Sequence, residues 1–301
     1  MSLLVQAFRR EVRDHGAYVE RSILRSKSFS IAVFRSSGLA LDFGLLTKAV
    51  RYMDSFARAQ LCLVVEGHGY FTRRGVVHTV SAGDATQSDQ SLQELEGYGG
   101  SPCELIAVEW DESSSFAMPT RGAPAEFLCI SPSQRVRLRS LVASVGSPTP
   151  ESWISSLFDE LIRLGLNGFA KHRCEALLPA PSVAASSLAT AYGALGDALG
   201  RLDLYPNLPE LAASLGVSDR QANRRLRDLA RDYGHPFSGF RELLHEGRLE
   251  WAIQLLSIPQ IPIRRAAQLA GYRSTAALHH ALALSGAPTP AAIQRTHADR
   301  W

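Results

Sequence analysis

The last third of the chain carries the same local pattern twice, and this repetition restricts the fold more than any other feature. In NLPELAASLGVSDRQANRRLRDLARDYG (207 to 234), a segment with helix-spaced apolar residues ends at Gly216, and Ser218 stands where it can cap a second helix. The segment IPIRRAAQLAGYRSTAALHHALALSGAPTP (261 to 290) repeats this pattern, with Gly271 at the corner. Each segment therefore predicts a helix, a tight turn and a second helix.

The second helix of the first unit has an apolar side and a hydrogen-bonding side. Ala222, Leu226 and Leu229 recur at steps of four and three, so they share the buried side. A solvated basic helix surface would look similar, but the turn chemistry and the helix face agree, which favours a helix that reads a DNA groove. The outward residues are Arg220, Asn223, Arg224 and Arg227 in this unit, and Thr275, Ala276, His279 and His280 in the second.

A third helix is predicted between the two units. In RLEWAIQLL (248 to 256), apolar residues stand at 249, 252, 253 and 256, which is the spacing of a helix buried on one stripe. A single buried helix between the units would hold them at a fixed distance.

With these motifs in order, the segment from about 188 to 295 resembles the DNA-binding domain of the AraC/XylS family of transcription regulators. The resemblance implies two recognition helices that enter successive major grooves of double-stranded DNA. It also implies that Arg220, Gln221, Asn223 and Arg224 read bases in the first unit, and Thr275, Ala276, His279 and His280 in the second. The matching motifs are LAASLGVS (211 to 218), Arg248-Leu249, Ala252 and Leu255-Leu256, Ala267 to Gly271-Tyr272, and Thr289-Pro290.

The chain departs from the family pattern at three places. The spacing from Ser218 to Arg248 is several residues longer than usual, through a longer recognition helix or a loop. In the second recognition helix, His280 stands where a basic residue is usual, so we expect the second unit to bind DNA more weakly. Ala287 stands where the family usually has glycine.

The chain before residue 135 has the sequence pattern of β-strands. Short alternating apolar runs are separated by glycines and polar turns, and VEGHGYFTRRGVVHTVSAGD (65 to 84) resembles the cupin-like sensor domain of the same regulators. The predicted fold class is α+β with several domains, a β-barrel with following helices and then an all-α domain. The predicted boundaries are 1 to 176 for the sensor and dimerisation domain (barrel about 20 to 130, helices about 135 to 175), 177 to 187 for a linker, and 188 to 301 for the DNA-binding domain.

Helix spacing follows the strands. The segment 135 to 145 is predicted to be helical, and Trp153, Leu157, Leu161 and Leu164 form one apolar stripe. This stripe either packs on the chain's own barrel or forms the seam of a homodimer, and helical spacing alone does not separate the two. We nevertheless expect a homodimer, with this stripe as part of its seam.

Composition narrows the class of protein. Residues 1 to 183 contain equal numbers of basic and acidic residues, so the net charge of +3 comes from residues 184 to 301. We expect a cytoplasmic protein that is not in a membrane, because the N-terminus lacks the pattern of a secretory signal and no apolar run is long enough to span a bilayer. The cysteines lack close pairs and are expected to be reduced; they are Cys62, Cys103, Cys129 and Cys174.

No pattern of catalytic or cofactor chemistry was found. His68 and His78 are ten residues apart without an HxH pair, so we expect no metal and no cofactor. His68 is more simply explained as a hydrogen-bonded strand residue than as a contact to an effector, and any effector of the sensor domain, a small molecule or a protein, is unknown. Two other classes stay open: a protein-interaction module with degenerate helix-turn-helix units, and an enzyme with its residues dispersed in the barrel.

Overall fold

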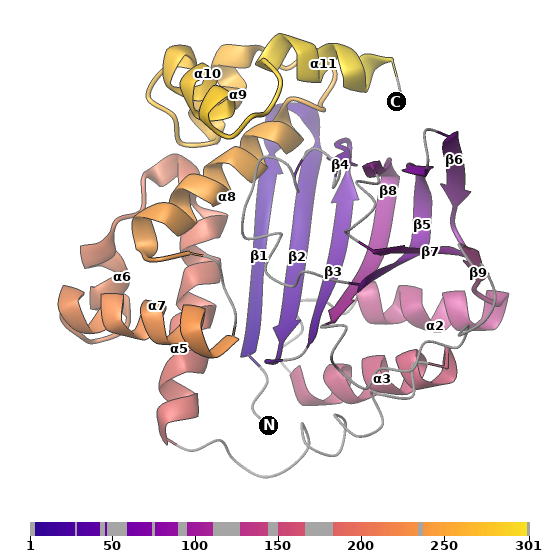
Figure 1. Ribbon diagram of the computed structural model, residues 1–301, viewed down its shortest axis with the longest axis horizontal. Coiled ribbons are helices and arrows are strands. Elements are labelled where there is room, and N and C mark those ends of the chain that lie inside the picture. Colours follow the sequence, from indigo (N-terminus) through magenta and orange to yellow (C-terminus); the bar gives the residue numbers. More distant parts are fainter. Residues whose placement is uncertain are drawn as a thin grey trace.

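The structure is a computed structural model of the 301-residue chain that describes residues 4–27, 29–42, 46, 59–73, 76–89, 95–110, 127–143, 150–165, 183–233 and 237–299. In Figure 1 a curled sheet occupies the middle, two helices lie beneath it, and the C-terminal helices lie above and to the left. This is the α+β arrangement that the sequence predicted.

The sheet is antiparallel throughout its described strands. Its order is β1-β2-β3-β8-β5-β7-β9, with β4 paired to β8 and β6 paired to β5. Within the described residues it is an open, curled half-barrel (Figure 1). The strands are β1 (Leu4–Val12), β2 (Ala17–Arg25), β3 (Phe29–Ser37), β4 (Leu41–Asp42), β5 (Ala59–Arg73), β6 (Val76–Ser81), β7 (Asp84–Asp89), β8 (Leu95–Trp110) and β9 (Phe127–Cys129), and a short 3-10 turn, η1 (Arg13–His15), joins β1 to β2.

The glycine-rich stretch 65 to 84 forms a long strand with a hairpin. A single strand, β5, runs through this stretch as far as Arg73, with register shifts around Glu66 where it pairs with β8. Gly67 has a φ of 93°, a conformation that side chains other than glycine rarely adopt. Gly83 lies in the turn that joins β6 to β7 and has a φ of 101°.

Both faces of the sheet are covered. Along β3, Ile31 and Val33 pack toward the core shared with α2 and α3, while Ala32 and Phe34 pack toward the core shared with the C-terminal helices. This alternation follows from the two-residue period of a strand. The helices are α2 (Pro132–Ala143), α3 (Pro150–Arg163), α5 (Val183–Gly200), α6 (Leu208–Ser214), α7 (Asp219–Tyr233), α8 (Phe240–Leu255), α9 (Ile263–Leu269), α10 (Thr275–Leu284) and α11 (Pro290–Ala298), and η4 (Leu202–Leu204) is a 3-10 turn.

The apolar stripe of α3 packs on the sheet of its own chain. Leu157 and Leu161 are fully buried, Trp153 is 8% exposed, and all three belong to the core that contains residues of β3 and β8. The Trp153 indole also donates a hydrogen bond to the carbonyl of Leu141 in α2, at 2.9 Å. The expectation that this stripe forms a homodimer seam was therefore wrong, and the alternative that it packs on its own domain is the correct one.

The first strand begins earlier than predicted. The barrel was expected from about residue 20, but β1 starts at Leu4. The strand is hard to recognise because two of its buried positions hold Gln6 and Arg10, so the sequence lacks an apolar alternation there.

Helix α5 begins at Val183, inside the segment predicted as a linker. It packs along β1, where Gln6 donates a hydrogen bond to the carbonyl of Tyr192 at 3.2 Å. A Cβ atom at Gly196 would lie 2.8 Å from the carbonyl oxygen of Ala7, so a glycine is needed for this close approach. Residues 177 to 182 lie outside the described part of the chain.

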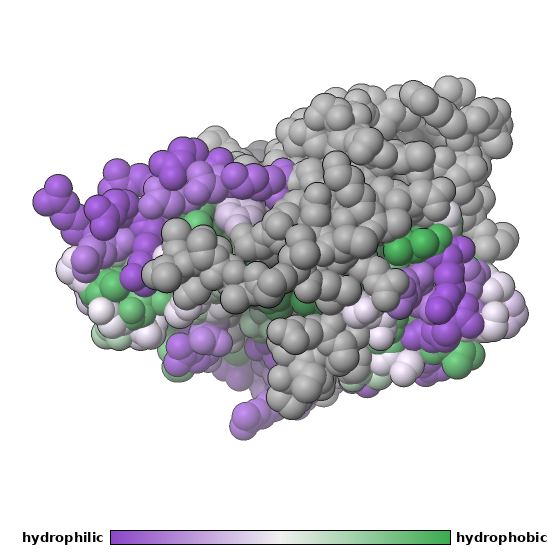
Figure 2. All heavy atoms as spheres, turned by 90° about the horizontal axis from the view of Figure 1, so that it is seen from below, coloured by the Kyte–Doolittle hydropathy of each residue, from purple (hydrophilic) through white to green (hydrophobic). Residues whose placement is uncertain are grey.

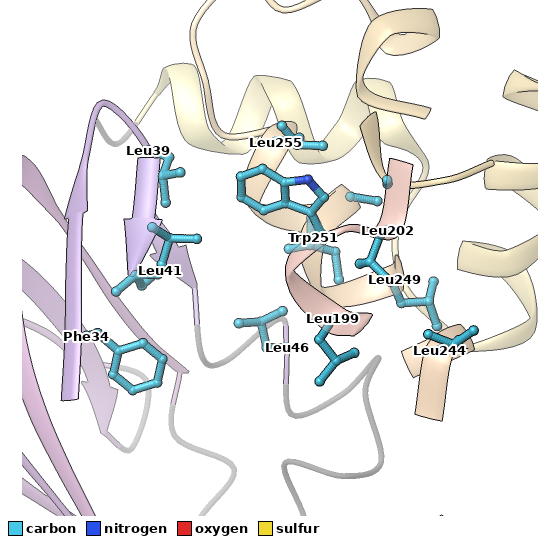
Figure 3. Packing of buried hydrophobic residues seen from close by; sticks show 14 of the residues in the cluster. Phe34, Leu39, Leu41, Leu46, Leu199, Leu202, Leu244, Leu249, Trp251 and Leu255 are labelled. Carbon is cyan, nitrogen blue, oxygen red and sulfur yellow. The ribbon is translucent and has the colours of Figure 1, made fainter. Parts of the chain in front are cut away.

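One apolar core joins the sheet to the C-terminal helices. Trp251 of α8 is 3% exposed and lies between leucines of the two parts (Figure 3). The labelled residues around it are Phe34, Leu39, Leu41 and Leu46 on one side, and Leu199, Leu202, Leu244, Leu249 and Leu255 on the other.

The burial of the α3 stripe leads to a prediction. Leu157→Ala should lower the free energy of unfolding by about 2 to 5 kcal/mol, because it removes a fully buried side chain, and it should leave the oligomeric state unchanged. Val136→Ala on α2 is the control, since Val136 is 69% exposed. Denaturant unfolding measures the change in stability, and light scattering measures the oligomeric state. A folded Leu157→Ala protein whose mass differs from that of the wild type would support a homodimer interface at this stripe.

Candidate nucleic-acid interface

The first unit is a helix-turn-helix with a well-formed corner. Gly216 has a φ of 62°, and the amide of Val217 donates to the carbonyl of Ala212 at 3.0 Å, so the carbonyls at the end of α6 are satisfied. Ser218 begins α7, because its hydroxyl accepts a hydrogen bond from the Gln221 amide at 3.3 Å. The predicted corner and cap are confirmed.

Gln221 completes this cap. Its side-chain oxygen accepts hydrogen bonds from the amide and hydroxyl of Ser218, at 3.0 and 3.1 Å. This reciprocal pair is a capping box. The sequence assigned Gln221 to base reading, which stays a prediction, but the structure gives its oxygen a part in starting the helix.

The outward side of α7 has the predicted composition. Arg220, Arg224 and Arg227 are exposed, and Asn223 is half-buried facing the start of α8, where a Cβ at Gly239 would lie 3.9 Å from its amide oxygen. The opposite side of the helix is buried, through Ala222, Leu226, Leu229 and Tyr233.

The charges of α7 are divided along its length. Arg231, in the last turn, pairs with Asp228 and Asp232 at 2.9 Å each, and these carboxylates raise its pKa. Over the described residues, no ion pair is found for Arg220, Arg224 or Arg227. The free positive charge therefore lies in the first two-thirds of the helix, where phosphate oxygens can neutralise it.

The unusually long spacing between Ser218 and Arg248 includes helix α7 and the segment that follows it. Helix α7 continues to Tyr233 and contains 15 residues. The other alternative, a loop around Gly234-His235-Pro236, lies outside the described residues, so a longer helix and a loop both stay predictions.

The second unit repeats the geometry of the first. Gly271 has a φ of 77°, the Tyr272 amide donates to the carbonyl of Ala267 at 2.8 Å, and the Ser274 hydroxyl accepts from the Ala277 amide at 3.1 Å. The predicted corner and cap are again confirmed. Ala276, His279 and His280 are exposed and Thr275 is half-buried, whereas Leu278, Ala281 and Leu282 are buried.

Gly286 explains why alanine fits at position 287, where the family usually has glycine. The left-handed turn after α10 is made by Gly286, with a φ of 76°, and Ala287 is not in that conformation. The next helix, α11, begins at a cap where the Thr289 hydroxyl accepts from the Ala292 amide at 3.3 Å. Alanine therefore costs little backbone strain at this position.

Helix α8 lies between the units, as its apolar spacing predicted. It has 16 residues and is buried along almost its whole length, including Leu249 and Ala252. Arg248 lies against the corner of the second unit, where a Cβ at Gly271 would come within 3.1 Å of its Nε. Burial lowers the pKa of Arg248, and nearby Tyr272 and Tyr205 oppose this effect.

A cavity of about 860 Å³ lies where the sheet meets the second unit. Its walls come from the connection between β3 and β4, from the end of α8 and from α11, and they are mostly apolar. Basic side chains (His68, Arg295 and His297) contribute to them, and none of the lining residues that the structure describes is acidic. The Nε2 atom of His297 lies 3.9 Å from a carboxylate oxygen of Asp42 on β4.

Among the described residues, no group of three or more His, Cys, Asp or Glu side chains could hold a metal ion. Cys62 and Cys103 are buried and not in a disulfide, and burial raises the pKa of the Cys103 thiol to about 12. No helix in the described ranges is long and apolar enough to cross a membrane.

Comparison with known proteins gives one curated relative in sequence. Over 79 residues the chain is 35% identical to the HTH-type transcriptional regulator VqsM of Pseudomonas aeruginosa. The match covers 26% of this chain, and the chain spans only 22% of the length of that relative. No family model matches the chain.

The similar solved structures include transcription regulators. ToxT from Vibrio cholerae is 11% identical with a TM-score of 0.34, over 89% of this chain and 98% of ToxT. The AraC-like transcriptional activator CuxR is 12% identical with a TM-score of 0.35, over 82% and 85% of the two chains. The DNA-binding domain of AdpA, solved with a target DNA, is 25% identical with a TM-score of 0.33, over 37% and 95%.

Likenesses at these TM-scores are too distant to assign a function. The chain's own features are a curled N-terminal sheet and two capped helix-turn-helix units with a buried helix between them. It has the architecture that its resemblance to the AraC/XylS transcription regulators implied.

The capping box of α7 leads to a prediction for stability. Ser218→Ala should lower the free energy of unfolding by about 0.5 to 2 kcal/mol, because the first turn of α7 loses its side-chain acceptor. Ser140→Ala, at an exposed position of α2, is the matched control and should change stability by less than about 0.5 kcal/mol. Equal unfolding midpoints for the two variants would show that Ser218 does not cap the helix.

Proposed function

We propose that this chain is a sequence-specific DNA-binding transcription regulator of AraC type. Its two helix-turn-helix units enter successive major grooves of one duplex, with α7 and α10 as recognition helices. The observation that supports this most is the exposed, unpaired arginine face of a capped recognition helix, held beside a second unit by one buried helix. Hydrophilic residues gather on the side of the molecule where α6 and α7 lie (Figure 2).

The base-reading residues proposed for the first unit are Arg220, Gln221, Asn223 and Arg224, with Arg227 on the same outward side of α7. Arginine forks match the acceptor pair of guanine, and asparagine matches adenine. In the second unit, Thr275, Ala276, His279 and His280 are proposed to face the groove. The first unit supplies most of the affinity, because α10 exposes no arginine or lysine.

The sensor role of the sheet domain is part of the same proposal. Residues 1 to 176 form the sensor domain and 188 to 301 the DNA-binding domain, and α5 leads from the end of the linker into the latter. A small effector would fit the cavity between the sheet and the second unit, whose volume is in the usual range for ligand sites. A ligand there would touch both domains and so would couple its own binding to that of DNA. A homodimer is also proposed, with its interface away from the buried stripe of α3.

A protein-interaction module is the second candidate. It is favoured by α10, which exposes Ala276 and Ala283, and by Leu284, which is 71% exposed. The salt dependence of binding distinguishes DNA binding from protein binding. Phosphate contacts weaken steeply as salt rises, whereas an apolar protein interface does not.

The arginine face of α7 gives a first binding prediction. Arg224→Ala should weaken binding to a duplex that the wild-type protein enriches from a randomised pool by about 1 to 3 kcal/mol, because a bidentate base contact is lost. Arg231→Ala is a matched control on the same helix, since Arg231 is already paired with Asp228 and Asp232. Fluorescence anisotropy at several salt concentrations measures the affinity of both variants. Equal affinities for Arg224→Ala and Arg231→Ala would show that Arg224 is not part of the DNA interface.

The histidines of α10 give a second binding prediction. His279 and His280 are exposed on α10 and would lie against phosphate if this unit enters a groove. The double variant His279→Ala, His280→Ala should weaken binding to the enriched duplex by less than Arg224→Ala does, because α10 exposes no arginine or lysine. Fluorescence anisotropy measures both variants, and a larger loss in the double variant would show that the first unit does not supply most of the affinity.

A further inference from the structure

Three arginines of the sheet are buried on the face that meets the C-terminal helices. Arg10 of β1 and Arg21 and Arg25 of β2 are 4%, 7% and 4% exposed. Arginine is rarely buried without partners, since desolvating a cation costs several kcal/mol. We call these residues the strand arginines and ask what each of them binds.

Each strand arginine contacts a different helix of the C-terminal part. The Nε of Arg10 donates to the carbonyl of Leu199, in the last turn of α5, at 2.8 Å. The guanidinium of Arg21 donates to the carboxylate of Glu250 on α8, also at 2.8 Å. The Nε of Arg25 donates to the carbonyl of Tyr233, the last residue of α7, at 3.1 Å.

The contacts of Arg10 and Arg25 are made to carbonyls at the C-terminal ends of helices. Carbonyls in the last turn of a helix have no partner within the helix, and the helix dipole places partial negative charge there. A guanidinium at that end satisfies the carbonyl and is attracted by the dipole. Arg10 and Arg25 therefore act as C-terminal caps that the sheet provides to α5 and α7.

The third contact links one of these caps, Arg10, to Arg21 through a carboxylate of α8. Glu250 is 1% exposed, and its second oxygen lies 3.9 Å from Arg10, so one carboxylate faces two strand arginines. Burial lowers the pKa of Arg10 to about 10, Glu250 opposes this effect, and the side chain stays charged at neutral pH. The guanidinium of Arg10 also lies 4.5 Å from the ring centroid of Phe8.

These contacts give α7 an anchor at each end. Its N-terminus is fixed by the Ser218 and Gln221 capping box of its own unit, and its C-terminus by Arg25 from the sensor sheet. A functional site works only when its groups are held to within about 0.5 Å and 10 to 20° of the productive geometry. The angle of α7 in a groove therefore depends on a residue that is far from DNA.

We infer that Arg25 is a positioning residue for DNA recognition, through which the sensor sheet sets the orientation of recognition helix α7. This inference rests on the proposed function, since it takes α7 to be the helix that reads bases. It assigns to the sheet a direct part in base selectivity. Phosphate attraction, by contrast, depends on the arginines of α7 and tolerates small changes of angle.

The test compares two duplexes and two matched arginines. The probes are the duplex that the wild-type protein enriches from a randomised pool and a scrambled duplex of the same composition. Arg25→Met should weaken binding to the enriched duplex about five- to twentyfold, in line with the loss of roughly one base contact, and should leave the scrambled duplex unchanged. Arg9→Met makes the same chemical change on β1 at an arginine whose side chain is 49% exposed, and should bind both duplexes as wild type does.

A conservative variant guards against loss of the fold. Arg25→Lys keeps a cation near the end of α7, so it should show the same pattern with a smaller loss on the enriched duplex. If Arg25→Met does not fold, the decision falls to this variant. A merely structural role would lower the folded fraction and weaken both duplexes equally, so the ratio of the two affinities is the decisive quantity.

Each remaining outcome is decisive as well. Wild-type affinities for both duplexes in a folded Arg25→Met protein, or an equal loss on both, would overturn the positioning role while leaving DNA binding intact. If the wild-type protein enriches no duplex from the pool, the proposed function fails first, and the positioning role is rejected with it.

Discussion

Helix α8 is buried on almost every side, and the arrangement of the molecule follows from that burial. Its apolar residues join the sheet, the first unit and the second unit in one core, with Trp251 between the leucines of the two parts. The same helix also carries Glu250 into this core, and a buried carboxylate is tolerated only where cations meet it. Arg10 and Arg21 meet this requirement, so the sheet must dock in one position for the charges to match.

The spacing of the two helix-turn-helix units follows from the same helix. Because α8 packs between them, α7 and α10 keep one separation while their exposed residues differ in charge. The first unit has free arginines, and the second has histidines, alanines and a threonine. A regulator built in this way would bind mainly through one unit and use the other for register, which agrees with the proposal that the sheet adjusts the first recognition helix.

The C-terminal part could be predicted from the sequence in detail, since each signal was local. Gly216, Gly271, Ser218 and Ser274 specify turns and caps within a few residues, and the structure has them where the pattern placed them. The first strand could not be predicted, because its inward positions hold Gln6 and Arg10, whose partners are almost 200 residues away. The stripe of α3 had two possible partners, and helical spacing could not distinguish a sheet of the same chain from a second copy. Local pattern identifies an amphipathic face but not what covers it.

The close packing of α5 on β1 also bears on how the chain can be divided. In the described sheet β1 stands at one end of the strand order, so its outer backbone groups have no neighbouring strand. Helix α5 covers this region, closely enough that Gly196 has no room for a side chain. A fragment of the sheet cut before α5 would therefore present a bare strand edge, which readily pairs with the same edge of another molecule. Helix α5, which begins the helical C-terminal part, thus also protects the sheet from self-association, and the two parts are less separable than a linker between them would suggest.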